Sequence, residues 1–186
     1  MGKKEHILQA ALELLVENGI HATPVSMISK KAKTGMGTIY NYFQNKDVLI
    51  NAIYVDIKTK EKNVLESVFE SELPVKVQFE NYYRSMVQFF IENPLFFSFM
   101  DQLQASPIIT TETKEVGLDA IEHVLELIAK GKKEHIIKNI DNNELLQFIG
   151  GSMLSYLRWI NRSNESSNLE DTLSNQIRLV WDGIKE

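Results

Sequence analysis

Residues 35–46 read Gly-Met-Gly-Thr-Ile-Tyr-Asn-Tyr-Phe-Gln-Asn-Lys and carry the strongest structural signal in the chain. Ile39 and Phe43 lie four positions apart, so a helix here turns both side chains inward on one face. Thr38 and Tyr42, also four apart, share another face that looks outward. Hydroxyl and amide groups on such a face can bond to the phosphates and base edges of DNA. On composition alone, a corner between two helices with solvated polar groups explains the same residues as well.

The preceding segments indicate a helix-turn-helix. Apolar residues at helical spacing predict a helix over residues 3–18, and Gly19 suits the left-handed position after its end. A second helix is expected to open with Thr23 as N-cap and Pro24 in the first helical position. Only residues 33–35 separate this helix from the next, so the two must meet at a steep angle.

A longer helix is expected to follow this head. Asn45 is its predicted N-cap, Lys46 its first residue, and its end is expected near Ser71. A helix N-terminus that carries an ammonium group forms a seat for phosphate. The sequence therefore predicts a contact with the DNA backbone at Lys46, directly after the outward face that carries Thr38 and Tyr42.

The bulk composition excludes several classes of function. The chain has 186 residues, a net charge of −5 and no cysteine, so neither a disulfide framework nor a thiolate site can form. Its four histidines show no metal-binding spacing, and we expect no metal, no cofactor and no enzymatic activity. No apolar run approaches the length of a membrane span and no signal-peptide core is present, so a cytoplasmic protein without membrane contact is expected.

The charge is divided unevenly along the chain. Residues 1–50 hold six Lys against four acidic residues, whereas residues 51–186 hold fourteen basic against twenty-one acidic residues. A slightly basic head on an acidic body fits a protein that meets DNA only with its head.

Residues 74–107 hold an unusual share of aromatic side chains, with six of the nine Phe between Phe79 and Phe99. Plain helical core is the simpler explanation, since aromatic rings bury large apolar areas. The excess over what one face of each helix needs favours a small-molecule cavity lined by aromatic and Met side chains. The candidate lining residues are Tyr83, Met86, Phe90, Phe97, Met100, Gln104, His123, Tyr156 and Trp159.

Further helices are expected from Pro74, over about 110–130, over 143–162 and after a cap at Ser167 or Asn168, with a break or weak spot at residues 131–133. The helix over 143–162 is apolar on nearly all sides, so it needs partners on both faces, and the chain's own core supplies only one. We therefore expect a two-fold dimer through a four-helix bundle of the last two helices. The expected interface residues are Gly150, Met153, Leu157, Leu173, Ile177, Val180 and Trp181.

The stretch from Ile7 to about Ile53 resembles the DNA-binding head of the TetR family of transcriptional repressors. The family pattern reads roughly G-T-[LI]-Y-x-Y-F-x-[NS]-K-[ED]-x-L, and residues 37–49, GTIYNYFQNKDVL, fit every defined position. The resemblance covers about the first quarter of the chain. Beyond it, only the helical pattern and the total length agree with the family.

The resemblance implies a set of DNA contacts. Phosphate contacts are expected from Thr23, Ser26, Thr38, Tyr40, Tyr42 and Lys46, and approach to the bases from Met36, Gly37, Thr38 and Asn41. Three positions depart from the family. Lys33 stands where a turn Gly is usual, Gly35 where a Ser cap is usual, and Met36 where a polar residue is common. Lys33 is expected either to hold a left-handed conformation, at a cost of roughly 1 kcal/mol, or to alter the turn.

The expected fold is all-α, with about nine helices. A helix-turn-helix DNA-binding domain over residues 1–50 precedes a ligand-binding and dimerisation domain over residues 51–186. The leading hypothesis is a homodimeric repressor that binds a near-palindromic operator in double-stranded DNA and is released from it by a small, largely apolar effector. The alternative is a DNA-binding dimer controlled by a protein partner, or an architectural one, with no small-molecule ligand.

Overall fold

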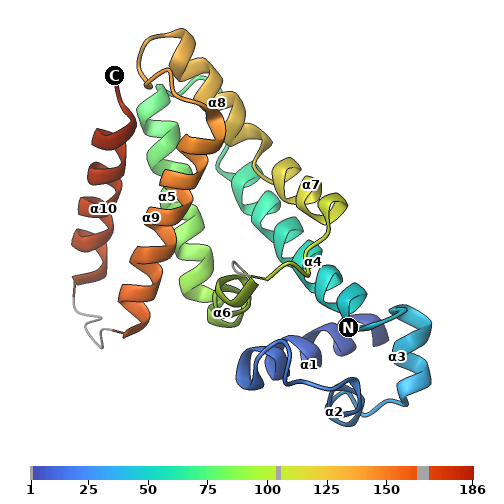
Figure 1. Ribbon diagram of the computed structural model, residues 1–186. Coiled ribbons are helices and arrows are strands. Elements are labelled where there is room, and N and C mark those ends of the chain that lie inside the picture. Colours follow the sequence, from blue (N-terminus) through green and yellow to red (C-terminus); the bar gives the residue numbers. More distant parts are fainter. Residues whose placement is uncertain (1, 104–105, 163–167) are drawn as a thin grey trace. The chain divides into compact units, whose positions relative to one another are not determined.

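The structure, a computed structural model, describes residues 2–103, 106–162 and 168–186 of the chain. These residues form ten α-helices and, besides them, an isolated bridge between Ile137 and Lys185, so the all-α prediction is confirmed. The helices, labelled in Figure 1, are α1 (Lys3–Asn18), α2 (Val25–Lys31), α3 (Met36–Tyr42), α4 (Lys46–Ser67), α5 (Val75–Glu92), α6 (Pro94–Leu103), α7 (Thr111–Asp119), α8 (Glu122–Lys133), α9 (Asn142–Arg162) and α10 (Leu169–Ile184).

The helices form two compact units. The first comprises Met1–Lys60 and Asn93–Asp119, and the second comprises Glu61–Glu92 and Ala120–Glu186. The helix α4 contributes residues to both, because the division falls after Lys60.

In the first unit, α1 packs against α2 and α6, and α2 packs against α3. Ile39 and Phe43 are almost fully buried, which confirms the predicted inward face of the third helix. Phe43 itself is extended, with φ −137°, so the helix ends there and the ring turns into the core. Ile28 of α2 and Leu15 of α1 complete this apolar centre.

A second set of contacts within the first unit joins α4 to the segment around α7. The buried Asn51 side chain donates from Nδ2 to the carbonyl of Ile108 at 3.0 Å, and its Oδ1 accepts the N–H of Thr110 at 3.1 Å. An added Cβ at Gly117 would lie 2.6 Å from the Tyr54 hydroxyl, so any larger residue there would have to displace the Tyr54 side chain.

In the second unit, α5 packs against α8, α9 and α10. The Phe79 ring lies 5.4 Å from the Trp181 ring, between centroids. The predicted break at residues 131–133 is wrong, because α8 continues to Lys133. Gly131 is buried in that last turn, where a Cβ would lie 2.5 Å from the Ile137 side chain, so its role is close packing.

Other boundaries differ by a few residues. The helix α4 ends at Ser67 and not near Ser71, and the single helix expected over 110–130 is two helices, with a break at residues 120–121. The helix α5 ends at Glu92, and Pro94 begins α6, where its missing N–H leaves no hydrogen bond unmade.

Candidate nucleic-acid interface

The turn between α2 and α3 is a Schellman motif. The N–H of Thr34 donates to the Ser29 carbonyl at 3.0 Å, and the N–H of Lys33 donates to the Lys30 carbonyl at 3.2 Å. Lys33 has φ 47°, so the left-handed conformation, one of the two expected alternatives, is the one it adopts. A residue with a Cβ is strained there by about 1 kcal/mol. The turn fixes the angle between α2 and α3.

The helix α3 presents a face of large, polar-tipped side chains and one bare glycine. Met36 is 43% exposed, and Tyr40 and Tyr42 are each 45% exposed. Asn41 is also exposed, while an added Cβ at Gly37 would meet no atom within 4 Å. Neighbouring side chains therefore leave the backbone at Gly37 open to close approach. A face of this kind can meet a groove with both hydroxyl and amide groups.

The N-terminus of α4 adds a positive charge beside this face. The side-chain oxygen of Asn45 accepts the N–H of Val48 at 2.9 Å, which confirms the predicted N-cap. The Lys46 ammonium group lies 3.4 Å from the His21 carbonyl, which it can reach as a donor. Burial lowers the pKa of Lys46, although Asp47 opposes the shift. A partly desolvated ammonium next to a helix N-terminus is suited to an anion.

Two of the predicted phosphate-binding residues in and before α2 have different surroundings. Ser26 is exposed, but Thr23 is fully buried and its hydroxyl is within hydrogen-bond distance of the carbonyls of Leu14, at 3.1 Å, and Gly19, at 2.9 Å. Thr23 thus satisfies the end of α1, and its side chain is not available to a phosphate in this conformation. The predicted N-cap is also wrong, because α2 begins at Val25 with Pro24 as its N-cap.

Sequence reasoning missed two exposed residues of α2. Met27 is 40% exposed, and Lys30 is exposed in the last turn of α2, four positions after the exposed Ser26. The four-residue spacing of Ser26 and Lys30 was the available signal.

The predicted cavity residues are divided between the two units. Phe97 and Met100 belong to the first unit, whereas Tyr83, Met86, Phe90, His123, Tyr156 and Trp159 belong to the second. Gln104 lies outside the described residues. His123 pairs with Glu126 at 3.0 Å and stacks on Phe69 at 4.2 Å between ring centroids.

Tyr83 lies in a buried polar network of the second unit. Gln176 donates to the Tyr83 hydroxyl oxygen at 3.2 Å, and that hydroxyl lies 3.3 Å from Ser152 Oγ. Because Ser152 donates its own proton to the Ile149 carbonyl, Tyr83 is the donor to Ser152. Burial raises the pKa of Tyr83, and the two side-chain hydrogen bonds oppose this. The neighbouring Tyr82 is 4% exposed, and its hydroxyl has no hydrogen-bond partner within the described chain.

The predicted dimer residues lie mostly in the core of the chain itself. Leu157, Leu173, Ile177, Val180 and Trp181 are at most 6% exposed, so they cannot form an outward surface, while Gly150 and Met153 are half-buried. Five of the seven predicted residues thus lie on the inner side of their helices, because apolar residues surround α9 and periodicity does not identify the buried side.

The outward face of α9 and α10 carries other large side chains. Phe148 is 45%, Trp159 47% and Leu179 66% exposed. Between the helices runs a groove of about 520 Å³, whose lining includes Trp159, Leu179 and Tyr156. Added Cβ atoms at Gly150 and Gly151 would meet nothing within 4 Å, so the chain's own packing does not require these glycines.

Two other kinds of site are absent from the described residues. No helix among them is both long and apolar enough to cross a membrane. Within the same residues, no group of three or more His, Cys, Asp or Glu side chains could hold a metal ion.

The chain matches two family models and several regulators. Residues 7–53 match the bacterial regulatory proteins of the tetR family, and residues 54–186 match the tetracyclin repressor-like C-terminal domain. The HTH-type transcriptional regulator YhgD of Bacillus subtilis is 26% identical over 140 residues, which are 75% of this chain and 68% of that protein. The fatty acid metabolism regulator protein of the same organism is 35% identical over 75 residues, 38% of this chain and 39% of that protein.

Solved structures share the whole fold. A tetR family transcription regulator from Shewanella sp. PV-4 aligns with a TM-score of 0.92 at 21% identity and 100% coverage of both chains. FadR from Bacillus subtilis, solved in complex with stearoyl-CoA, aligns with a TM-score of 0.77 at 20% identity, covering 97% of this chain and 98% of that one. These relatives are transcription regulators and not enzymes. The chain therefore belongs to the TetR family of DNA-binding transcription regulators.

Proposed function

We propose that this regulator is a homodimeric repressor that binds a near-palindromic operator and is released from it by a small, largely apolar effector. The observation that carries the DNA-binding part is the open face of α3, beside an ordered turn and a cationic helix N-terminus. We keep the proposed division into a DNA-binding domain over residues 1–50 and a ligand-binding and dimerisation domain over residues 51–186. A cytoplasmic location follows from the same proposal.

In this proposal α3 enters the major groove. Asn41 and the open backbone at Gly37 approach the base edges, and Met36 can contact a thymine methyl group. Tyr40, Tyr42, Thr38, Ser26 and Lys46 hold the phosphates, with Lys30 added from the exposed end of α2. Thr23 is withdrawn from the set, because its side chain is buried.

The second copy is proposed to cover the outward face of α9 and α10. Phe148, Trp159 and Leu179 supply the apolar area, and the glycines at 150 and 151 allow close approach of a partner helix. A two-fold axis through this face would make a four-helix bundle from two copies of each helix. Two heads could then read two half-sites.

The effector is proposed to bind in the second unit beside α5. The buried Tyr82 hydroxyl supports a ligand with a polar group, because an unpaired buried hydroxyl costs free energy that a hydrogen bond would recover. The related FadR was solved with stearoyl-CoA, in which an apolar acyl chain is joined to a charged nucleotide. Acyl thioesters are therefore the first compounds to try, although they are larger and more polar than the effector class proposed from the sequence.

Selection of bound fragments from a random DNA pool tests the DNA-binding part, and the spacing of the half-sites reports the dimer. Acyl-CoAs of increasing chain length are then added to the operator complex. Release by one of them, lost in Tyr82→Phe while operator binding persists, supports the effector site. A compound that binds the second unit without moving the operator affinity would contradict release and favour control by a protein partner.

A further inference from the structure

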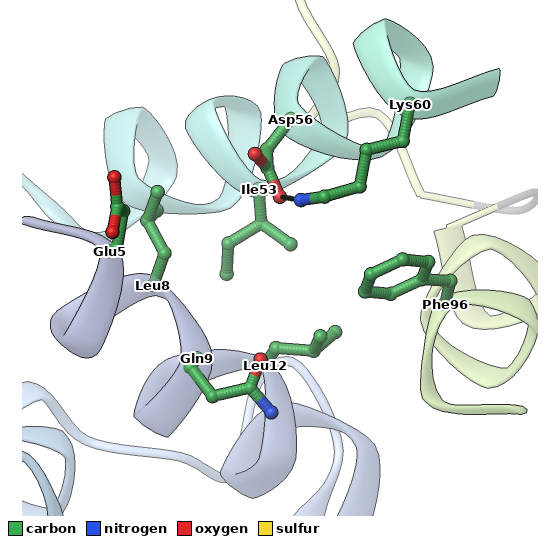
Figure 2. A pocket seen from close by; sticks show the side chains of 8 residues that line it. All are labelled: Glu5, Leu8, Gln9, Leu12, Ile53, Asp56, Lys60 and Phe96. Carbon is green, nitrogen blue, oxygen red and sulfur yellow. Dashed lines mark hydrogen bonds and ion pairs between the residues drawn. The ribbon is translucent and has the colours of Figure 1, made fainter. Parts of the chain in front are cut away.

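The first unit contains a cleft outside the DNA-contact face. It has a volume of about 370 Å³, and α1, α4 and α6 all contribute to its walls. Figure 2 shows the side chains of these helices directed towards the shared space. A volume of this size falls within the range of small-molecule sites.

The cleft combines an apolar wall with a charged one. Leu8, Leu12 and Ile53 form the apolar part, and Leu12 and Ile53 are buried. Glu5 and Asp56 bring two carboxylates, whereas Lys60 is the one cation among the described residues that line the cleft. At neutral pH the lining therefore carries one net negative charge, which favours a cationic occupant over an anionic one.

One ammonium group already occupies the charged end. The Lys60 Nζ pairs with Asp56 and lies 5.3 Å from the centroid of the Phe96 ring (Figure 2). The ring face thus receives a cation in the observed arrangement, beside a carboxylate that neutralises it. The charged end of the cleft therefore already holds one alkylammonium group, which belongs to the chain's own Lys60.

The Lys60 ammonium group can be displaced from its position beside Asp56. The side chains of Lys60 and Asp56 are each 44% exposed, and a solvent-exposed ion pair of this kind contributes little to stability. The Lys60 side chain can therefore turn towards water at small cost.

We propose that this cleft binds small primary alkylammonium compounds. The alkyl chain lies along Leu8, Leu12 and Ile53, and the ammonium group replaces that of Lys60 against Asp56 and the Phe96 ring. The site is separate from the proposed effector site of the second unit. Its occupant touches α1, α4 and α6 together, so it can modulate the head independently of the effector.

The test uses the full-length protein and three probes of equal length, which are hexylammonium chloride, 1-hexanol and sodium hexanoate. Methyl resonances of Leu8, Leu12 and Ile53 report binding at this cleft, and so distinguish it from binding elsewhere. Hexylammonium is expected to shift these resonances with saturation at millimolar concentration, on the order of 1 mM, whereas hexanol binds more weakly and hexanoate does not bind.

Two substitutions should move the affinity in opposite directions. Asp56→Asn removes the carboxylate and is expected to weaken hexylammonium binding about tenfold, and Phe96→Leu about threefold. Lys60→Met removes the internal competitor and is expected to tighten binding about fivefold. A gain of affinity cannot come from a damaged fold, which keeps the test decisive.

Three results would overturn the proposal. One is the absence of methyl shifts with hexylammonium, and another is equal binding of hexylammonium and hexanol. The third is hexanoate binding that Lys60→Met abolishes, since that result would make Lys60 the receptor of an anion.

Discussion

Two faces of this molecule leave large side chains exposed, and they differ in chemistry. The face of α3 carries Met36 and two tyrosines, Tyr40 and Tyr42, whose rings end in hydroxyl groups. The face of α9 and α10 carries the apolar side chains Phe148, Trp159 and Leu179. Each includes glycine that the chain's own packing does not require. Polar tips suit a hydrated polyanion, and apolar area suits a second copy of the same surface. Exposure alone therefore favours no particular partner. The chemistry of the exposed groups favours DNA for the face of α3 and a second copy of the chain for the face of α9 and α10.

The largest expected effect lies on the apolar face. Leu179→Glu places a carboxylate in the proposed interface twice, once from each copy, and is expected to raise the dimer dissociation constant about 100-fold or more, or about 3 kcal/mol. Sedimentation at a series of concentrations measures it. Leu118→Glu is the matched control, because Leu118 is 51% exposed on α7, outside this face. Equal dimerisation of the two variants would remove α10 from the interface.

Gly37 of α3 and Gly151 of α9 allow the two faces to be compared directly. Gly37→Ala is expected to weaken operator binding about tenfold and leave dimerisation intact, while Gly151→Ala should weaken the dimer and leave the isolated fold intact. Neither added Cβ would meet an atom within 4 Å, and alanine is the better helix former. Fluorescence anisotropy with operator DNA and sedimentation separate the two effects. Loss of folding in either variant would contradict the open packing.

Lys46→Ala tests whether the polar face binds phosphate. We expect weaker binding to all DNA sequences alike, by about tenfold or less, and a salt dependence whose slope is smaller by about 1. Anisotropy titrations at several salt concentrations measure the slope. A changed sequence preference with an unchanged slope would assign Lys46 to the bases instead.

Lys33→Gly concerns the turn that aims the polar face. Glycine adopts φ 47° without the strain of a Cβ, so the free energy of unfolding is expected to rise by roughly 1 kcal/mol. Urea denaturation measures the change. A fall in stability would mean that the Lys33 side chain makes a favourable contact that outweighs the strain.

The smallest effect is expected at an ion pair that does not belong to either face. Lys31 lies 2.8 Å from Glu13, and its hydrogen bond lowers the pKa of Glu13 below the ordinary value of 4.5. The pair therefore stabilises the fold above that value, and the contribution is lost as the pH falls through the lowered pKa. Since both side chains are 36% exposed, Glu13→Gln is expected to cost about 0.2–1 kcal/mol at neutral pH and nothing in strong acid. Denaturation at both pH values measures the difference. An equal loss in acid would mean that the charge of Glu13 is not the cause.

Local patterns predicted the head well. The inward pair Ile39 and Phe43, the cap at Asn45 and the left-handed Lys33 each depend on residues within one or two helical turns, so spacing and residue type suffice. The prediction for Thr23 is wrong because this residue lies between α1 and α2 and can bond to the end of either helix. Its hydroxyl met the carbonyls at the end of α1, and this partner is visible only once α1 and α2 are packed.

The C-terminal helices show the opposite case. Their apolar character was readable in the sequence, but Leu157 and Ile177 proved to be core, and Phe148 and Leu179 surface. A helix that is apolar all round has no preferred side in its own sequence, so the packing of α5 against α9 and α10 decides which side is covered. The same holds for Gly131, which looks like a helix end in sequence but lies against Ile137 in the fold. The local sequence thus determined the helices and turn of the head. Contacts between residues distant in the chain decided where the cleft, the core and the outward face lie. The reason is that only tertiary packing assigns an apolar side chain to one neighbour rather than another.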